Sequence, residues 1–227
     1  MTDLVEAINL TRYFDLSRNQ RVHAVENVSL SVGEKEIVGL VGESGSGKTT
    51  FGKTLVGLHA KSSGIAKFRG ETLPQKYRPA DFQRLAPKMQ MIFQDPYSSL
   101  NPRMTIGEII GEGLKLHTSV SADSLRERVA EWLEQVGLKA DHMSRYPHEF
   151  SGGQRQRIGI ARALILEPEF VVCDEPISAL DVSVQAQVIN LLGELKERMG
   201  LTLLFIAHDL SMVRYVSDRM AVMYLGS

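Results

Sequence analysis

A glycine-rich segment carries the strongest chemical pattern in the sequence. Residues 42–49 read Gly-Glu-Ser-Gly-Ser-Gly-Lys-Thr, which fits the spacing G-x-x-x-x-G-K-[ST]. Glycines there let backbone N–H groups converge on phosphate oxygens, because a Cβ would obstruct either the loop or the ligand. Lys48 would reach the β and γ phosphates of a nucleotide, and the Thr49 hydroxyl would ligate magnesium. An accidental match is a roughly 1% event on average residue usage, so we expect a phosphate site.

Two adjacent carboxylates end an apolar run at residues 170–175. Side chains alternate along a strand, so Asp174 and Glu175 should point in different directions and have separate roles. Asp174 suits a magnesium shell, and Glu175 suits a general base for an attacking water. Two acids at a strand end are more often solvated turn residues, but a phosphate loop in the same chain favours the catalytic interpretation.

A second glycine pair opens a helical pattern at Ser151-Gly152-Gly153-Gln154. The segment predicts a capping box, in which Ser151 accepts from the amide of Gln154 and the Gln154 side chain reaches back. Glycines in a first turn are costly, and bare amides at the positive end of a helix suit an anion, so we expect a second phosphate site. The arginines that follow either strengthen the local field or form a solvated face: Arg155, Arg157 and Arg162.

Two further polar residues follow expected strands. His208 comes after residues 202–207, and Gln94 comes after residues 89–93. A lone histidine is usually structural or solvated, but the carboxyl ends of parallel strands gather at one sheet edge, which favours a phosphate contact for His208. The amide of Gln94 could bridge magnesium and water, although this signal is weak by itself.

The elements that must position these residues alternate between strands and helices. Alternation at residues 28–32 predicts a half-buried strand, and residues 37–41 predict a strand buried on both faces, followed by a helix bearing Leu55, Val56 and Leu58. Apolar runs at 89–93, 170–173 and 202–206 predict further strands. Helical spacing precedes a stop at Gly200, with these apolar positions: Val184, Val188, Leu191 and Leu195. The pattern is typical of an α/β fold with a parallel sheet and right-handed crossovers.

Residues 95–150 interrupt this alternation. They open with a turn-rich run and continue with helical periodicity. One apolar stripe is formed by Leu125, Val129, Leu133 and Val136. We therefore expect a single domain over residues 1–227 with a helical subdomain inserted at about 95–150.

Composition narrows the classes of protein. The 227 residues include 26 basic and 27 acidic side chains, for a net charge of -1, and 43% are hydrophobic. These values exclude a disordered chain and argue against an obligate nucleic-acid binder. The one cysteine, Cys173, cannot close an internal disulfide or build a zinc site. With no basic leader and no run of about 18 apolar residues, we expect a cytosolic chain that is neither exported nor membrane-spanning, and that could sit against a membrane protein.

The order of these motifs resembles the ATP-binding cassette (ABC) transport ATPases over essentially the whole chain. The resemblance implies a P-loop NTPase fold: a RecA-like, mostly parallel sheet core, an N-terminal antiparallel β subdomain and an inserted α-helical subdomain. It implies ATP and Mg²⁺ as cofactors, with Thr49, Gln94 and Asp174 as metal ligands and Glu175, His208 and Gln94 as catalytic residues. The implied nucleotide contacts in this chain are Gly42, Ser44, Gly45, Ser46, Gly47, Lys48, Thr49 and Thr50.

Other motifs of the family match by position. Gly42 to Thr49 is similar to its Walker A loop, Gln94 to its Q-loop, residues 151–154 to its signature, Asp174 with Glu175 to its Walker B end, residues 178–181 to its D-loop, and His208 to its switch histidine. The family also stacks the base on an aromatic near the N-terminus. Phe14 is the best match and Tyr13 the alternative, and a buried strand aromatic is an equally good interpretation of each.

The resemblance also implies partners. Two cassettes would face head to tail, so that Ser151, Gly152, Gly153 and Gln154 of one serve the nucleotide on the other. ATP binding would close the dimer, hydrolysis would reopen it, and the helical subdomain would pass this motion to membrane-spanning partners. The resemblance is closest to oligopeptide and dipeptide importer ATPases, on residues 94–102, 145–150 and 181–187.

Such importers pair two different ATPases with two permease subunits and an extracytoplasmic binding protein, at the cytoplasmic face of the bacterial inner membrane. The ATPases of nickel and glutathione importers share many of these sequence motifs. The chain ends at residues 224–227 where relatives continue, which indicates a shortened form. Two alternatives are a cassette ATPase acting on DNA or ribosomes, and a nucleotide-responsive subunit with little turnover. Intact Lys48, Ser151, Glu175 and His208 weigh against the second.

Overall fold

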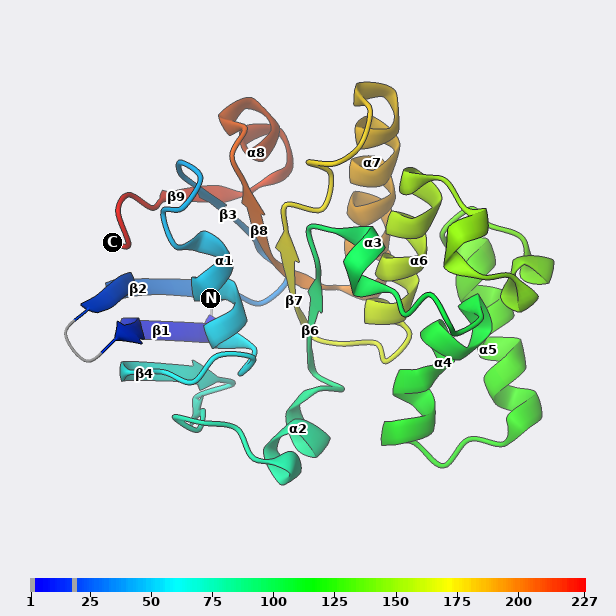
Figure 1. Ribbon diagram of the computed structural model, residues 1–227, viewed down its shortest axis with the longest axis horizontal. Coiled ribbons are helices and arrows are strands. Elements are labelled where there is room, and N and C mark those ends of the chain that lie inside the picture. The colour runs from blue at the N-terminus through cyan, green and yellow to red at the C-terminus, as the bar shows by residue number, and fades with distance from the viewer. Residues whose placement is uncertain (1–2, 18–19) are drawn as a thin grey trace.

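Two β-sheets and a group of helices make up the computed structural model, which describes residues 3–17 and 20–227 (Figure 1). The N-terminal sheet is antiparallel and has the order β2-β1-β4-β5. Its strands are β1 (Asp3–Ser17), β2 (Gln20–Gly33), β4 (Ser63–Phe68) and β5 (Glu71–Thr72). The expected N-terminal antiparallel subdomain is confirmed.

The second sheet is parallel and has the order β6-β7-β8-β3-β9. Its strands are β3 (Ile37–Val41), β6 (Met89–Ile92), β7 (Phe170–Asp174), β8 (Thr202–Ala207) and β9 (Arg219–Val222). Every residue of β3, β7 and β8 is buried, which explains why their sequences read as continuous apolar runs. The expected parallel core is confirmed.

Alternation along β7 feeds two separate apolar cores. Val171 and Cys173 belong to the core on the side of the long helices, whereas Phe170 and Val172 belong to the core shared with the antiparallel sheet. Phe51 of α1 (Lys48–Leu55) is fully buried in that second core. Because all the pairings in this sheet are parallel, the carboxyl ends of its strands emerge at one edge.

The helix after the glycine-rich loop is shorter than the sequence indicated. It ends at Leu55, and Val56 and Leu58 lie beyond it. Gly57 takes the left-handed conformation at φ 80°, which stops the helix, and the Leu58 side chain is 47% exposed. The expectation that these three apolar residues share one helix was therefore wrong.

Helices α7 (Val182–Met199) and α8 (Leu210–Val216) pack against the parallel sheet, and the short helix α2 (Pro79–Leu85) precedes β6. In α7, Val188 and Leu195 are buried, and Gly200 ends the helix with φ 65°, as its periodicity and glycine stop predict.

The remaining helices form a group beside the sheet (Figure 1). They are α3 (Pro96–Ser99), α4 (Ile106–His117), α5 (Ala122–Gln135), η1 (Ala140–Ser144), η2 (Pro147–Glu149) and α6 (Gly152–Leu164). Val129, Leu133 and Val136 are buried, in agreement with the predicted stripe. Helix α6 packs against α3, α4 and α5, so the helical packing continues past the expected limit near residue 150.

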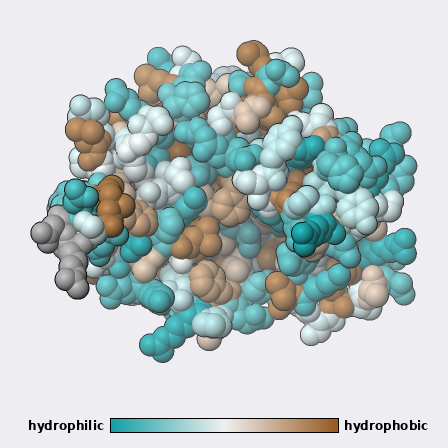
Figure 2. Space-filling model, in the orientation of Figure 1, coloured by the Kyte–Doolittle hydropathy of each residue, from teal (hydrophilic) through white to brown (hydrophobic). Residues whose placement is uncertain are grey.

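The surface offers no sign of a bilayer-spanning element in the part of the chain that the structure describes. None of its helices has both the length and the apolar character that crossing a membrane requires. The face in Figure 2 is mostly hydrophilic, with apolar atoms scattered over it rather than gathered in one continuous patch.

Candidate functional site

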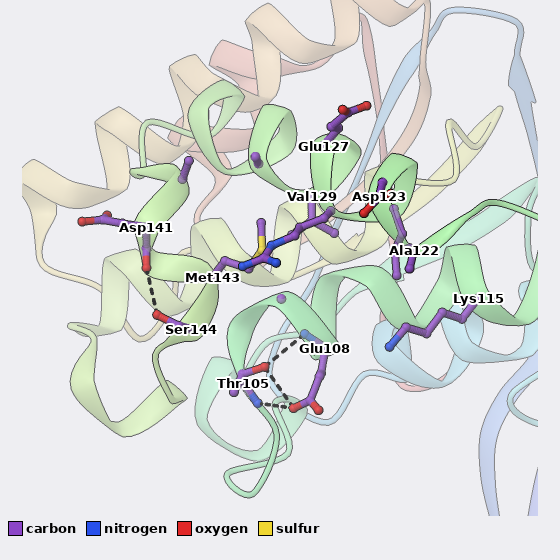
Figure 3. Close-up of a pocket in the computed structure, with 15 residues that line it drawn as sticks. Thr105, Glu108, Lys115, Ala122, Asp123, Glu127, Val129, Asp141, Met143 and Ser144 are labelled. Carbon is purple, nitrogen blue, oxygen red and sulfur yellow. Dashed lines mark hydrogen bonds between the residues drawn. The ribbon is translucent and has the colours of Figure 1, made fainter.

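Two large cavities differ in what lines them. One, of about 910 Å³, lies among α4, α5 and η1, with Leu125, Val129 and Met143 beside charged residues such as Glu108 and Arg126 (Figure 3). It contains none of the strand-end residues that the sequence singled out. The other, of about 840 Å³, lies at the carboxyl ends of the parallel strands and gathers most of them. The second cavity is therefore the candidate catalytic site.

Most of the expected site residues line the strand-end cavity. They are Ser44, Gly45, Gly47, Lys48, Thr49, Thr50, Gln94, Glu175 and His208. Three others lie directly behind it. Gly42 opens the loop, Ser46 is 3% exposed, and Asp174 is 2% exposed against Thr49.

The glycine-rich loop joins β3 to α1, as the sequence predicts. Gly47 begins α1 with φ 99°, a conformation that residues with a Cβ rarely adopt. A Cβ on Gly47 would also lie 2.0 Å from the carbonyl oxygen of Ala24 on β2. Lys48 is 4% exposed, and its Nζ donates to the carbonyls of Gly42 and Glu43 at 2.8 Å each. The ammonium thus spans the mouth of the loop, where an incoming phosphate would take over these bonds.

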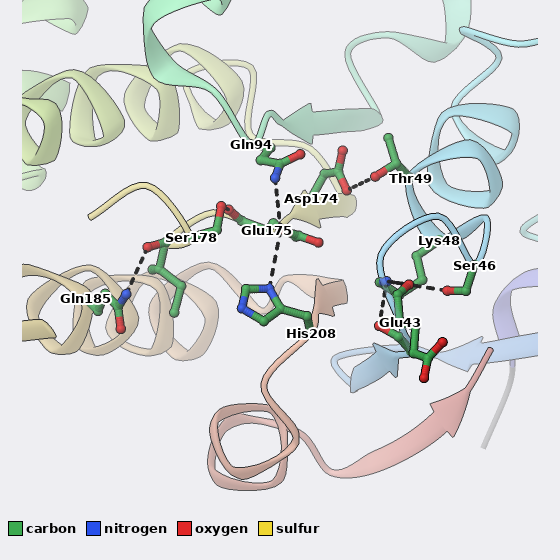
Figure 4. A network of polar contacts seen from close by, with 12 residues as sticks. Glu43, Ser46, Lys48, Thr49, Gln94, Asp174, Glu175, Ser178, Gln185 and His208 are labelled. Atoms are coloured by element: carbon green, nitrogen blue, oxygen red, sulfur yellow. Dashed lines mark hydrogen bonds and ion pairs between the residues drawn. The ribbon is translucent and has the colours of Figure 1, made fainter. Parts of the chain in front are cut away.

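The first hydroxyl of α1 is bonded to the buried acid of β7. Thr49 Oγ1 donates to Asp174 Oδ1 at 2.7 Å (Figure 4). Burial raises the pKa of the Asp174 carboxyl, and the hydrogen bond from Thr49 opposes that rise. A buried carboxylate whose charged form is disfavoured gains from a nearby cation, so this pair has the electrostatics of a cation site.

Glu175 turns away from Asp174, because the strand ends between them. Its backbone takes φ 43° and its amide donates to the Ile206 carbonyl, so the side chain leaves the sheet edge. Glu175 Oε2 accepts from Gln94 Nε2 at 2.9 Å, and His208 Nδ1 lies 3.5 Å from the same oxygen (Figure 4). The structure therefore brings together the ends of β6, β7 and β8, with the carboxylate at the centre.

Sequence reasoning missed the wall at the other end of the cavity. Residues of β2 and of the turn after β9 line it: Val22, His23, Ala24, Leu225 and Gly226. Asp95, next to Gln94 in the chain, also lines the cavity and was not predicted. The Gly226 amide donates to Ser46 O, and its carbonyl accepts from Glu26 N, which ties this turn to the loop. These residues form no sequence motif, and the contacts that tie the turn to the loop are made by backbone atoms. Ser178 and Ala179 also line the cavity, and the sequence had placed them in the D-loop segment.

The two candidate aromatics lie near this wall without lining the cavity. Phe14 is paired across the sheet with Val22, and Tyr13 with His23, so the two rings stand on opposite faces. The Phe14 ring is 4.3 Å from the Arg12 guanidinium carbon and 5.3 Å from the His59 ring. The Tyr13 hydroxyl donates to Glu26 at 3.2 Å. Each aromatic is thus paired with a residue that lines the cavity, Phe14 with Val22 and Tyr13 with His23, and the Tyr13 and His23 ring centroids are 4.3 Å apart. The Tyr13 ring is already engaged by His23 and Glu26, which leaves Phe14 as the freer candidate to stack on a base.

The Ser151–Gln154 segment does not reach the strand-end cavity of its own chain. The predicted capping box is confirmed: Gln154 N donates to Ser151 Oγ at 3.4 Å, and Ser151 N donates to Gln154 Oε1 at 3.0 Å. A Cβ on Gly153 would lie 2.5 Å from Val184 of α7, so close packing is a further reason for glycine there. The first turn of α6 remains partly exposed.

Thr49 and Asp174 bring two oxygen ligands for a hard cation together, and Gln94 follows the neighbouring strand β6. A hydroxyl, a carboxylate and the amide oxygen of Gln94 are the donors that Mg²⁺ prefers, and the residues present fit that ion. Within residues 3–17 and 20–227, no group of three or more His, Cys, Asp or Glu side chains is placed to hold a metal. A cation here would thus rely on ligands besides carboxylates, phosphate oxygens among them.

Comparisons with known proteins agree with this geometry. The family model described as ABC transporter matches residues 25–178. The chain belongs to the ABC transporter family. It is 54% identical over 224 residues to the oligopeptide transport ATP-binding protein OppF of Bacillus subtilis (strain 168), covering 98% of this chain and 73% of that protein. It is 50% identical to the protein of the same name from Escherichia coli (strain K12), covering 98% of this chain and 69% of that one.

Solved structures of the ABC transporter family share the fold. A dimeric ATP-binding cassette, MJ0796, in a post-hydrolysis state with ADP and phosphate, has a TM-score of 0.89 at 28% identity, over 98% of this chain and 95% of that one. The CbiO1 cassette from Clostridium perfringens has a TM-score of 0.83 at 25% identity, over 100% and 86%. Membership of this family establishes ATP binding and hydrolysis as the chemistry of the fold.

Proposed function

We propose that this chain is the ATP-hydrolysing subunit of a bacterial peptide importer and that residues 1–227 form one cassette. The observation that carries the proposal is the meeting of Glu175, Gln94 and His208 at one end of the cavity that the glycine-rich loop also lines, where the γ-phosphate would lie. The names of relatives that are 50–56% identical support peptide import over other cargo.

Phosphate binding follows from the loop and the start of α1. The N-terminus of α1 directs unpaired amides and its positive dipole end at the loop. Lys48 Nζ, which donates to the Gly42 and Glu43 carbonyls, would exchange these neutral acceptors for β- and γ-phosphate oxygens. This would replace two bonds from the ammonium to neutral carbonyls by bonds to charged phosphate oxygens, which are stronger acceptors for it.

Hydrolysis requires a base beside the γ-phosphate. Glu175 Oε2 would accept the proton of the attacking water, and Gln94 Nε2 and His208 Nδ1 would fix the carboxylate's orientation until a nucleotide draws them away. His208 would then contact the γ-phosphate. A bound Mg²⁺ would neutralise the charge of the phosphates. Thr49, Asp174 and Gln94 are the residues that would hold it, and the 2.7 Å bond between the first two shows that their oxygens already meet.

Among the residues that the structure describes, the cavity lining includes no second glycine-rich helix start beside the one before α1. The first turn of α6, with Ser151, Gly152, Gly153 and Gln154, offers the bare amides of its two glycines but lies outside this chain's own cavity. We infer that it serves the nucleotide bound to a second cassette, in a head-to-tail dimer that ATP closes and hydrolysis reopens. The same ATP would thereby act as substrate and as part of the interface.

The partners would be a second ABC ATPase, two permease subunits and, indirectly, an extracytoplasmic binding protein. The cavity among α4, α5 and η1 fits a short amphipathic segment of a permease, because its apolar floor is bordered by charges of both signs (Figure 3). Binding to such permease subunits would hold the chain at the cytoplasmic face of the inner membrane. A role on DNA or ribosomes is not favoured by any of these contacts.

Uptake into proteoliposomes that contain the permease pair, the second ATPase and the binding protein tests the proposal. We expect ATP-dependent accumulation of a labelled tripeptide with the wild-type chain and none with Glu175→Gln. Nickel and glutathione serve as competing cargo in parallel assays. Accumulation of either in place of the peptide would contradict peptide import while leaving the ATPase assignment intact.

A further inference from the structure

Two arginines on one face of α6 hold the segment that carries Gln94. Arg155 and Arg162 are two helical turns apart, so they project from the same side of the helix. The Arg155 guanidinium carbon lies 4.0 Å from the centre of the Tyr97 ring. Arg162 Nη1 donates to the carbonyl of Ser99, the last residue of α3. Both contacts fall on residues 93–99, the seven-residue segment that carries Gln94.

Each arginine is fixed at more than one point. Arg155 Nε also donates to the carbonyl of Pro147, just before the signature segment, at 2.7 Å. The Arg162 guanidinium carbon lies 5.8 Å from the Phe93 ring, next to Gln94 in the chain. A planar guanidinium can donate in its plane and stack on a ring with its face, which an ammonium cannot do equally well.

Burial of the Arg162 guanidinium costs desolvation free energy, which a solvent-exposed arginine does not lose. Burial lowers the pKa of its guanidinium, and the Glu112 carboxylate only partly offsets this. Its hydrogen-bond acceptor is a neutral carbonyl at the end of a one-turn helix, where unpaired carbonyls concentrate negative partial charge. The buried Arg162 guanidinium is held by a backbone carbonyl and an aromatic ring, and it therefore links α6 to the segment around Gln94.

We propose that Arg155 and Arg162 join the Phe93–Ser99 segment to α6 as one unit, so that Gln94 at one nucleotide and Ser151 at the other move together. This rests on the proposed function, in which the two ends of that unit serve different ATP molecules. Both arginines act through other residues and are therefore positioning residues. In α6, Ser151 lies directly before the first turn, so a displacement of the helix displaces the bare amides with it.

Arg157 provides a matched control on the same helix. Its guanidinium donates to the Val136 carbonyl at 2.8 Å and to Gln187 at 3.1 Å, which anchors α6 to α5 and α7 instead of to the Q-loop. Gly159 provides a second, because it lies between Arg155 and Arg162 on their face and a Cβ there meets nothing within 4 Å. Arg157→Ala shows whether loosening α6 in general is enough to produce an effect. Gly159→Ala shows whether any added side chain on the face of Arg155 and Arg162 is enough.

Hydrogen–deuterium exchange and steady-state ATPase kinetics of the full chain test the inference together. We expect Arg162→Ala to speed amide exchange in residues 95–101 by about tenfold or more, since the bond to a charged donor is lost. We expect kcat to fall by about tenfold while KM for ATP stays within about twofold, because the residue does not touch the nucleotide cavity. Arg162→Lys should restore part of both, and Arg157→Ala and Gly159→Ala should change neither.

Equal effects of Arg157→Ala and Arg162→Ala would overturn the inference, as would a change in KM alone or unchanged exchange in Arg162→Ala. The proposed function fails differently. A wild-type chain without MgATP hydrolysis would contradict that function, whereas the exchange comparison would still decide whether the arginines join the two elements.

Discussion

Replacing Glu175 by glutamine should remove most ATP hydrolysis and leave ATP binding intact. Glu175 Oε2 accepts from Gln94 at 2.9 Å and lies 3.5 Å from His208, and a glutamine of equal length can keep an oxygen acceptor for Gln94. An amide cannot take a proton from water. Loss of a general base costs about 10²–10⁴ in rate, which is about 3–5 kcal/mol of barrier.

Phosphate release at saturating MgATP and equilibrium binding of ATP measure the two parts of this prediction. Glu43→Gln is the matched control, because it makes the same chemical change on an exposed side chain of the glycine-rich loop. The control should keep wild-type turnover. Turnover of Glu175→Gln within about threefold of wild type would refute the assignment of the base.

Three further predictions concern the glycine-rich loop, the Cys173 thiol and the aromatic residue that stacks on the nucleotide's adenine. Gly47→Ala forces a Cβ to 2.0 Å from the Ala24 carbonyl at φ 99°, so thermal melting should show a loss of about 1–3 kcal/mol, and an unchanged melting temperature would contradict this. Cys173 is fully buried and burial raises the pKa of its thiol to about 12, so at pH 8 it stays protonated; a thiol reagent should react only after unfolding, and native labelling would disprove it. Phe14→Ala should weaken ATP binding about tenfold and Tyr13→Ala should not, judged by titration, and the reverse order would show that Tyr13 stacks on the base.

The glycine-rich loop and the strand-end acids could be predicted because local sequence determines them. A buried strand, a loop of fixed spacing and a helix appear in order, and parallel strands bring their carboxyl ends to one edge. Gln94, Glu175 and His208 follow three such strands, so their meeting required no knowledge of distant contacts. The fold class was predictable for the same reason.

Features set by contacts between distant segments could not be read from the sequence. The need for glycine at position 47 comes partly from the Ala24 carbonyl on another sheet. The wall formed by Val22 and Gly226 depends on how that sheet and the turn after β9 meet the loop. The end of α1 at Leu55 was missed because apolar residues continue the helical pattern past a left-handed glycine.

The arginines of α6 show where sequence reasoning stops short of a decision. Their positions were equally compatible with a phosphate field and with a solvated face. The structure gives Arg155 and Arg162 ring and carbonyl partners in the Q-loop segment. Side chains of this length reach neighbours that helical periodicity alone does not specify.

Mixing two inactive variants tests the central claim that each ATP site is shared by two chains. Lys48→Ala removes the phosphate lysine and Ser151→Arg blocks the signature end, so a dimer of either variant has no complete site. A mixed dimer has one complete site out of two, and half of randomly formed dimers are mixed, so the mixture should recover about a quarter of wild-type ATPase activity. No recovery on mixing, in a preparation whose wild-type chain hydrolyses ATP alone, would contradict the shared site.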